Sequence, residues 1–385
     1  MMRRRAELQQ EVANVFGVHI ETPADRLMLE TIIQNSTKEE LMDKLAAYYR
    51  KQDPNRKPLL KQLPTMLARN VKDLSKEEFD ELLTSPDWVY EEKLDGCRAK
   101  LHFTKDGCRI DSRHRSVTTY EYAEKTDCFP HFRDWKVDWA VGTILDGEVL
   151  MPVNEMNSGK TQTEGSLTTT ASVFNSSPER SIELQMRFGP CMFVAFDILC
   201  HNGADIRSLP FGSRRFRLGM VTGRLHHASL KITTLFTCDP RTHYEQILQF
   251  GGEGLMLKNL HAPYPLREGQ RTRAMYKWKK SYDIDCFITG FVPGEGEFSG
   301  LVGALLVSIM DRERPREIGA IQPGTLDIRR EMSHADGSLK DAYYSKVVEV
   351  NFQDWTKNKR MRHAILKRFR PEKNPYECNI DQGGK

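Results

Sequence analysis

The sequence predicts an α+β protein that starts with a small helical segment, continues as a mixed domain of strands and helices, and ends in an all-β barrel of the OB type. Apolar residues recur at helical spacing over residues 1–62. Short apolar runs divided by turns, with a few helices, follow over 63–283. Over 284–376 the runs are strand-like and the turns rich in glycine, which is typical of a small closed barrel. Residues 377–385 are expected to form a C-terminal tail.

The composition is that of a globular protein, with 39% hydrophobic and 29% charged residues in a chain of 385. This length suffices for two or three domains with a buried core. No apolar run approaches the roughly 18 residues of a membrane span, so no membrane partner is expected. The basic start is followed by no apolar segment, and the eight cysteines include no Cys-x-x-Cys pair. We therefore expect no secretory signal and no zinc site, and reduced thiols in the cytoplasm, or in the host cytoplasm if the source is viral.

Two helix starts are predicted in the N-terminal segment. Thr22 precedes Pro23, which is typical of an N-cap followed by proline in the first turn. Ser36 and Glu39 have the spacing of a capping box. The segment has two open interpretations, a cap that shields the main domain or an element that grips nucleic acid.

Strands are predicted where apolar runs are bounded by turn residues. Between Met151 and Pro190 the chain is polar and rich in Ser, Thr and Asn, so we expect an excursion over the surface with one helix starting at Ser177. The predicted strands are 99–103, 109–112, 144–150, 192–199, 255–257, 286–291, 304–309 and 347–352.

The stretch around Lys93 has the strongest chemical character. Lys93 stands between strand-like residues, and Asp95-Gly96 follows at once and favours a tight turn. An amine held at such a bend, partly desolvated and near other cations, loses basicity and becomes a nucleophile at neutral pH. The same pattern also occurs in ordinary hairpins, so its meaning depends on the rest of the chain.

Further stretches supply the other groups that nucleotidyl transfer requires. Asp146-Gly147-Glu148 offers carboxylates for a divalent metal or a ribose hydroxyl, and Phe196 offers an aromatic face for a purine. Each stretch has an ordinary structural interpretation by itself, as a turn, a core residue or a solvated strand face. Together they provide a nucleophilic amine, carboxylates, an aromatic ring and cations for phosphates. The cation-bearing stretches are Ser112–Arg115, Glu253–Lys258, Tyr276–Lys279 and Arg370–Lys373.

In this order the stretches resemble the motifs of the ATP-dependent DNA ligase family, within the covalent nucleotidyltransferase superfamily, over about residues 63–375. Glu372 stands where the family usually has Asp, which keeps the charge but adds a methylene. The resemblance implies a nucleotidyltransferase (adenylation) domain of antiparallel sheets with helices, followed by an OB-fold domain. The matching stretches are Glu91-x-Lys93-x-Asp95-Gly96-x-Arg98 for motif I, Ser112-Arg113 for motif Ia, Asp146-Gly147-Glu148 for motif III, Phe196-Asp197 for motif IIIa, Glu253–Lys258 for motif IV, Lys277-x-Lys279 for motif V and Arg370-x-Glu372-Lys373 for motif VI.

The resemblance also implies a reaction. Lys93 would attack the α-phosphorus of ATP and hold AMP, which then passes to the 5′-phosphate of a nick before the 3′-hydroxyl displaces it. Glu91 would read the adenine and Phe196 would stack on it. The ribose and nearby phosphate would be surrounded by Arg98, Arg113 and Glu148.

The remaining motif residues are implied to act on metal and phosphates. Glu253, with Glu148, would place Mg²⁺. The α-phosphate would be neutralised by Lys258, Lys277 and Lys279, which as close cations would also lower the pKa of Lys93. Arg370 and Lys373 lie in the barrel domain and would reach the pyrophosphate only by closure about a hinge near 281–285.

The charge distribution favours a nucleic-acid partner, and we expect nicked duplex DNA bound by a monomer. Residues 267–280 carry six Lys or Arg against one acid, and 357–373 carry eight against one. Within the superfamily, an RNA ligase and an mRNA-capping guanylyltransferase remain alternatives, and outside it a catalytically inert nucleic-acid-binding module. NAD is disfavoured as donor because the chain has no zinc-type cysteine cluster.

Overall fold

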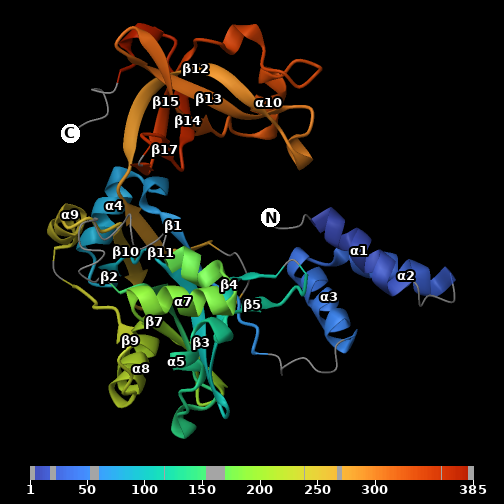
Figure 1. The fold of residues 1–385 in the computed structure, drawn as a ribbon, viewed down its shortest axis with the longest axis vertical. Coiled ribbons are helices and arrows are strands. Elements are labelled where there is room, and N and C mark those ends of the chain that lie inside the picture. The colour runs from blue at the N-terminus through green and yellow to red at the C-terminus, as the bar shows by residue number, and fades with distance from the viewer. Residues whose placement is uncertain are drawn as a thin grey trace. The chain divides into compact units, whose positions relative to one another are not determined.

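The computed structural model describes residues 5–17, 23–52, 60–116, 118–152, 170–237, 239–266, 271–356 and 358–379 (Figure 1). The chain divides into two compact units, Met1–Trp278 and Lys279–Lys385. The division falls inside a single strand, β11 (Arg271–Lys279). In the part of the chain that the structure describes, no helix is both long enough and apolar enough to cross a membrane.

Three helices form the N-terminal segment, and they pack on the loop after β4. They are α1 (Arg5–Gly17), α2 (Pro23–Asn35) and α3 (Lys38–Gln52). Their core includes Leu8, Val12, Leu41 and Leu45, together with Tyr120 from that loop.

Polar contacts join these helices to the rest of the first unit. Arg115 Nη1 lies 2.7 Å from Asp43 Oδ1, and Arg50 Nε donates to Glu121 Oε1 at 2.9 Å. Glu11 accepts hydrogen bonds from the Tyr120 hydroxyl at 2.6 Å and from the Tyr49 hydroxyl at 2.7 Å.

The predicted capping box of α3 is wrong by one residue. Thr37 and Glu40 form it, with the Thr37 amide donating to Glu40 Oε2 at 2.7 Å and the Glu40 amide donating to Thr37 Oγ1 at 3.2 Å. Ser36 instead donates its hydroxyl to the carbonyl of Ile32 at 2.7 Å, at the end of α2. The predicted N-cap Thr22 lies outside the described residues.

A seven-stranded sheet forms the centre of the first unit, in the order β5-β4-β3-β6-β7-β8 with β9 paired to β7. Neighbouring strands run antiparallel, except that β9 is parallel to β7. The strands are β3 (Cys97–Thr104), β4 (Gly107–Arg115), β5 (Tyr122–Glu124), β6 (Ile144–Leu150), β7 (Met192–His201), β8 (Ala204–Asp205) and β9 (Leu230–Ile232).

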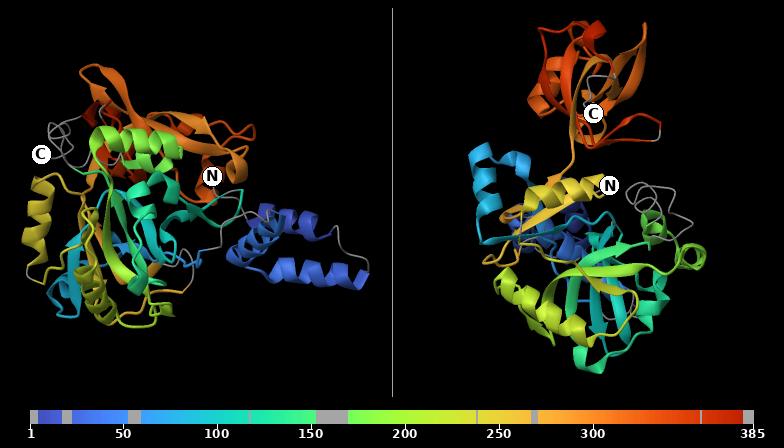
Figure 2. Two further views of the ribbon diagram at one scale, coloured as in Figure 1. Left: turned by 60° about the horizontal axis from the view of Figure 1, so that its bottom comes forward. Right: turned by 90° about the vertical axis from the view of Figure 1, so that its left-hand side faces the viewer.

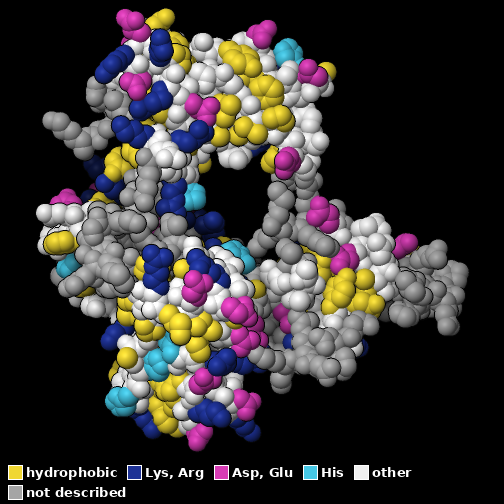
Figure 3. All heavy atoms as spheres, viewed as in Figure 1, with side chains coloured by type: hydrophobic (Ala, Val, Ile, Leu, Met, Phe, Trp, Pro, Cys, Tyr) yellow, Lys and Arg dark blue, Asp and Glu magenta, His cyan; other side chains and the backbone are white. Residues whose placement is uncertain are grey.

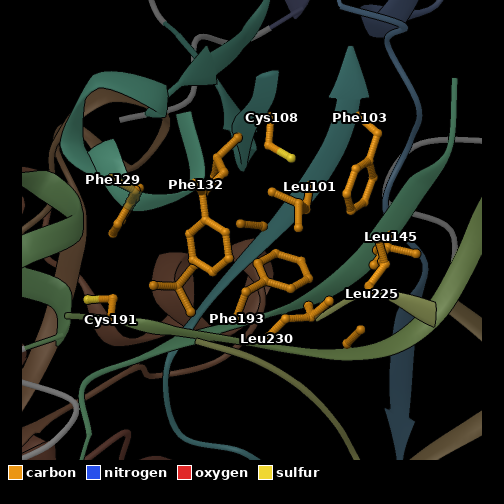
Figure 4. Packing of buried hydrophobic residues seen from close by; sticks show 14 of the residues in the cluster. Leu101, Phe103, Cys108, Phe129, Phe132, Leu145, Cys191, Phe193, Leu225 and Leu230 are labelled. Carbon is orange, nitrogen blue, oxygen red and sulfur yellow. The ribbon is translucent and has the colours of Figure 1, made fainter. Parts of the chain in front are cut away.

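The main core lies on one face of this sheet. Because side chains alternate along a strand, Leu101 and Phe103 of β3 point into the core, where they meet Phe132 and Phe193 (Figure 4). Side chains from three helices also enter this core. These helices are α5 (Pro130–Arg133), α7 (Pro178–Phe188) and α8 (Phe211–Arg224), whose ribbons are drawn in the further views of Figure 2.

The predicted surface excursion between Met151 and Pro190 is wrong for the part that the structure describes. Val173, Phe174 and Leu184 are buried in the main core. The helix predicted from Ser177 is present as α7, and the Ser177 side chain caps it. Residues 153–169 lie outside the described part.

A second sheet of four strands has the order β1-β11-β10-β2. A small cluster joins it to the first sheet, since Met275 of β11 packs with Ile144 of β6 and Leu199 of β7. The elements are β1 (Leu67–Asn70), β2 (Trp88–Glu92), β10 (Gly254–Asn259), α4 (Lys76–Thr84) and α9 (Pro240–Gln249).

The second unit is an antiparallel sheet in the order β14-β13-β12-β15-β18. An isolated bridge between Gln322, just after β14, and Ile365, the first residue of β18, brings the two edge strands together as in a barrel. The elements are β12 (Tyr282–Pro293), β13 (Val302–Asp311), β14 (Arg314–Ile321), α10 (Leu326–Met332), β15 (Val347–Phe352), β16 (Asp354–Trp355), β17 (Met361–Arg362) and β18 (Ile365–Phe369).

Candidate active site

Lys93 lies in the four-residue connection from β2 in one sheet to β3 in the other. Its amide donates to the Gly254 carbonyl at 2.9 Å, which holds this connection against the start of β10. Gly96 ends the connection where space is short, because a Cβ there would lie 2.3 Å from the Val149 carbonyl oxygen. The close packing against β6 therefore explains why glycine stands at position 96.

The half-buried ammonium of Lys93 forms an ion pair with Glu253, which directly precedes β10. Its Nζ also lies 3.4 Å from the Leu94 carbonyl. The Glu253 carboxylate is thus in direct contact with Lys93.

Glu91 and Lys258 form a second ion pair, deep between the strands β2 and β10. Glu91 is 2% exposed and Lys258 is 3% exposed. The other carboxylate oxygen of Glu91 accepts a hydrogen bond from the Thr233 hydroxyl at 2.7 Å. Both oxygens of Glu91 are therefore held, and the orientation of this carboxylate is fixed.

Phe196 links this pair to Arg98. The Lys258 Nζ lies 4.5 Å from the centre of the half-buried Phe196 ring, and the Arg98 guanidinium carbon lies 5.0 Å from it. The next residue, Asp197, is buried and forms two hydrogen bonds with Arg214, at 2.8 and 2.9 Å. The half-buried Phe196 ring is therefore accessible to a ligand, whereas the Asp197 carboxylate is part of the core.

Arg98 is fixed by a buried network on the face of the seven-stranded sheet opposite the main core. Its guanidinium donates to both oxygens of Asp146, at 3.0 and 2.7 Å, and to the Met66 carbonyl at 2.7 Å. The Tyr264 hydroxyl donates to Asp146 Oδ2 at 2.9 Å and accepts from the Met66 amide at 2.9 Å. Burial alone would raise the pKa of Asp146, but Arg98 outweighs it and holds that pKa below its ordinary value.

Glu148 lies opposite Arg98, on β6. Burial raises the pKa of the Glu148 carboxyl to about 7, although Lys93, Arg98 and Arg113 oppose the shift. These three cations therefore act electrostatically on one carboxylate. Arg113 itself is exposed and contacts the ring of His114 at 3.0 Å.

Cys97 is not a nucleophile in this arrangement. Burial and the nearby Glu148 carboxylate raise the pKa of its thiol to about 12. The thiol therefore stays protonated near neutral pH, and Cys97 packs against the main core.

Lys277 and Lys279 lie two residues apart on β11 and so share one face of that strand. Lys277 is aligned with Asn70 on β1. Arg370 and Lys373 belong to the second unit, where Asp285 contacts both of them. Within the first unit the structure brings together the predicted residues Lys93, Glu253, Glu148, Arg113, Arg98, Phe196, Lys258 and Glu91.

The two carboxylates near Lys93 could bind a metal ion that takes most of its ligands from a substrate. Among the described residues, no group of three or more His, Cys, Asp or Glu side chains is placed to bind a metal ion. Mg²⁺ usually binds one or two carboxylates together with substrate phosphates, not a full cage of protein ligands. Glu148 and Glu253, as separate carboxylates near Lys93, fit that pattern.

The sequence did not indicate the residues that hold these groups in place. Tyr264 and Thr233 were not singled out, although Tyr264 fixes Asp146 and Thr233 fixes Glu91. Tyr264 is 166 residues from Arg98 in the chain. We find no local pattern around it that could have marked it.

Comparison with known proteins identifies the family. Residues 65–279, more than half of the chain, match the family model of the ATP dependent DNA ligase domain. A probable DNA ligase of Dictyoglomus thermophilum is 30% identical over 234 residues, which are 58% of this chain and 38% of that protein. DNA ligase C1 of Mycolicibacterium smegmatis is 27% identical over 326 residues, 77% of this chain and 88% of that protein.

A solved structure confirms the predicted fold class. It comes from a structure–function study of Lig E DNA ligases and DNA binding by a minimal scaffold. It aligns with a TM-score of 0.53 and 23% identity, covering 81% of this chain and 100% of that chain. The chain covers only part of the length of other relatives. It spans, for example, 54% of the DNA ligase of Methanopyrus kandleri. The predicted family is confirmed by the match over residues 65–279: the chain belongs to the ATP-dependent DNA ligase family.

Proposed function

We propose that this chain seals nicks in duplex DNA, using ATP and Mg²⁺, through a lysine–AMP intermediate. One observation carries the proposal: ion pairs, ring contacts and electrostatic interactions connect Lys93 to Glu91 through the predicted motif residues. Residues that are far apart in sequence thus form one site, which can take a nucleotide with its phosphate near Lys93 and its base near Phe196 and Glu91.

In the first step, the Lys93 amine in its neutral form attacks the α-phosphorus of ATP. The bond to the β-phosphate oxygen breaks, pyrophosphate leaves, and the amine loses a proton. Before that step Lys93 must exchange its ion pair with Glu253 for the substrate. Mg²⁺, held by ATP phosphates with Glu253 and Glu148, would supply positive charge to the phosphates.

The remaining residues orient the nucleotide. Phe196 offers its ring to the adenine, and the fixed carboxylate of Glu91 lies beside it. Arg98, Arg113 and Glu148 are proposed to surround the ribose and its phosphate, which their mutual electrostatic interaction supports. Lys258, Lys277 and Lys279 are proposed to neutralise the α-phosphate, and Lys258 would have to share its charge with Glu91.

The second and third steps act on DNA. A 5′-phosphate oxygen at the nick attacks the AMP phosphorus and releases Lys93, and then the 3′-hydroxyl attacks the 5′-phosphate and AMP leaves. The basic runs at 267–280 and 357–373 support a duplex partner, since they favour phosphate contacts. Residues 267–270 and Lys357 lie outside the described part of the chain. A monomer in the cytoplasm, with the domain boundaries predicted at 62/63 and 283/284, remains our expectation.

A nick-sealing assay tests the proposal. Wild type, Lys93→Ala and Lys105→Ala would each receive matched nicked duplexes, all-DNA and all-RNA, with Mg²⁺ and either ATP, GTP or NAD. Lys105 lies exposed in the turn between β3 and β4 and controls for the loss of a lysine. We expect sealing of the DNA nick with ATP alone, lost in Lys93→Ala and kept in Lys105→Ala.

Other outcomes would overturn the proposal. Sealing of RNA alone would assign an RNA ligase, and labelling of Lys93 by GTP without sealing would assign a guanylyltransferase. No label from any donor would indicate an inert binding module.

A further inference from the structure

We propose that Asp285 is a positioning residue that presents Arg370 and Lys373 to the phosphates of ATP. This inference rests on the proposed function, in which these two cations act on the pyrophosphate. It is carried by contacts inside the second unit alone.

Asp285 belongs to a pair of acids on neighbouring strands. Asp285 on β12 lies directly opposite Glu349 on β15, and each residue is 8% exposed. Like charges directly opposite on adjacent strands repel each other, and buried charges persist where cations compensate them. Figure 3 shows Lys and Arg side chains gathered on one side of the second unit, among fewer acids. The ion pairs that compensate the two acids are made by Lys367, Arg368, Arg370 and Lys373.

The two acids share Arg370 but otherwise hold different cations. Asp285 accepts from Arg370 Nη1 at 3.2 Å and from Lys373 Nζ at 2.5 Å. Glu349 accepts from Lys367 at 2.5 Å and from Arg368 at 2.6 Å, and Arg370 lies 3.3 Å away. Among the described residues, Asp285 is therefore the acid that both motif VI cations share.

The backbone around these cations adds to the positioning. The Arg370 amide donates to the Val347 carbonyl at 2.8 Å, and the Lys373 amide donates to the Arg370 carbonyl at 3.1 Å. The turn is thus tied to β15, while both side chains remain partly exposed. A ligand can therefore reach the exposed parts of both side chains while Asp285 contacts them.

Holding both cations in advance reduces the cost of binding phosphate. Arg and Lys side chains both lose rotamer freedom when they are ordered. A strand-borne carboxylate that orders both of them before ATP arrives removes much of that loss from the binding step. A displacement of about 1 Å in such a site can cost 10²-fold in rate.

The alternative, that Asp285 only competes with phosphate for the cations, predicts the opposite sign. Asp285→Asn would then make the region more positive and strengthen the use of ATP. If Asp285 instead positions Arg370 and Lys373, the same substitution makes both side chains more mobile and weakens the use of ATP. The direction of the effect therefore decides between the two.

Asp283 provides a matched control. It lies two residues earlier on β12, so its side chain is on the same face. It contacts Lys367 at 3.1 Å and Asn351 at 2.6 Å, and among its described contacts neither Arg370 nor Lys373 appears. Asp283→Asn makes the same change in charge on the same strand.

The experiment compares the full chain with Asp285→Asn, Asp283→Asn and Lys373→Ala in two reactions. The first is single-turnover labelling of Lys93 by ATP with Mg²⁺, measured over a range of ATP concentrations. The second is sealing of a nick whose 5′-phosphate already carries AMP, a reaction that releases no pyrophosphate.

We expect Asp285→Asn to slow labelling by about 10- to 100-fold and to change pre-adenylylated sealing less than about twofold. Combining Asp285→Asn with Lys373→Ala should add little, because both act on one group. Asp283→Asn should match wild type in both reactions. If Asp285→Asn does not fold, Asp285→Glu, which keeps the charge but shifts it by a methylene, should slow labelling with the same selectivity.

Labelling that is unchanged or faster in the Asp285 variants would overturn the inference. So would an equal loss in Asp283→Asn, or an equal loss in both reactions, since either would indicate a purely structural role. If the wild type neither labels nor seals, the proposed function itself is wrong, which is a separate result.

Discussion

The Tyr264 hydroxyl joins Asp146 to the Met66 main chain, and its removal by Tyr264→Phe should destabilise the first unit strongly. The substitution keeps the ring, which is 1% exposed, and removes a single oxygen. Two hydrogen bonds of 2.9 Å disappear with it, one donated to Asp146 and one accepted from the Met66 amide.

The magnitude follows from what each partner loses. Asp146 keeps both hydrogen bonds from Arg98. The loss of its bond from Tyr264 should therefore lower the free energy of unfolding by about 1 kcal/mol, a typical net value for one hydrogen bond. The Met66 amide is left buried without its acceptor, which costs about 1–3 kcal/mol. We therefore expect the free energy of unfolding to fall by about 2–4 kcal/mol, a large part of the roughly 5–15 kcal/mol of a typical domain.

Urea unfolding followed by tryptophan emission measures this loss. Of the five tryptophans only Trp355 lies in the second unit, so a Trp355→Phe background confines the signal to the first unit. Tyr276→Phe is the matched control, because Tyr276 is also buried in the first unit and its hydroxyl has no hydrogen bond to the described residues. A loss below about 0.5 kcal/mol, or one equal to that of Tyr276→Phe, would refute the reasoning.

Two further predictions concern packing and acid stability. Gly96→Ala should lower the free energy of unfolding by about 1–3 kcal/mol, because its Cβ would lie 2.3 Å from the Val149 carbonyl oxygen and 2.5 Å from Leu150 Cδ2; the same urea assay checks it. Gly219→Ala, in α8 with nothing within 4 Å, should instead be neutral or stabilising, and equal losses at both glycines would contradict the packing argument. Hydrogen bonds from Lys367 and Arg368 lower the pKa of Glu349 from 4.5 to about 2, so the stability it confers is present above pH 4.5 and lost as pH falls toward 2. In a variant that keeps only Trp355, Glu349→Gln should lose less stability between pH 5 and pH 3 than its parent, and parallel losses would show that another group controls this range.

Many strands, and the order of the motif stretches along the chain, were predictable because both depend on local sequence. Apolar runs bounded by turn residues marked β6, β7 and β15 at nearly their full length and the middle parts of β3, β12 and β13. The barrel strands β14 and β18 were not predicted. The cap of α3 was misplaced by one residue because Ser36–Glu39 and Thr37–Glu40 satisfy the same pattern. Only the bond from Ser36 back to Ile32 separates the two.

What escaped prediction depends on contacts between distant residues. The segment after 170 is polar overall, yet a few side chains such as Phe174 suffice to anchor it in the core. Thr233 and Tyr264 stand in unremarkable surroundings in sequence, and only the fold brings them to Glu91 and Asp146. The sequence singled out the residues of the candidate site, but not Thr233 and Tyr264, which hold Glu91 and Asp146 in place.

The attachment of the N-terminal helices has a practical consequence for anyone who shortens this chain. Removing residues 1–52 would expose Tyr120. It would also remove the ion pairs that Arg115 forms with Asp43 and that Glu121 forms with Arg50. Arg115 ends the strand that carries Arg113, so the cut would disturb a neighbour of the candidate site. A truncated chain with low activity would therefore not show that the helices bind DNA, because it would also have lost the support of β4.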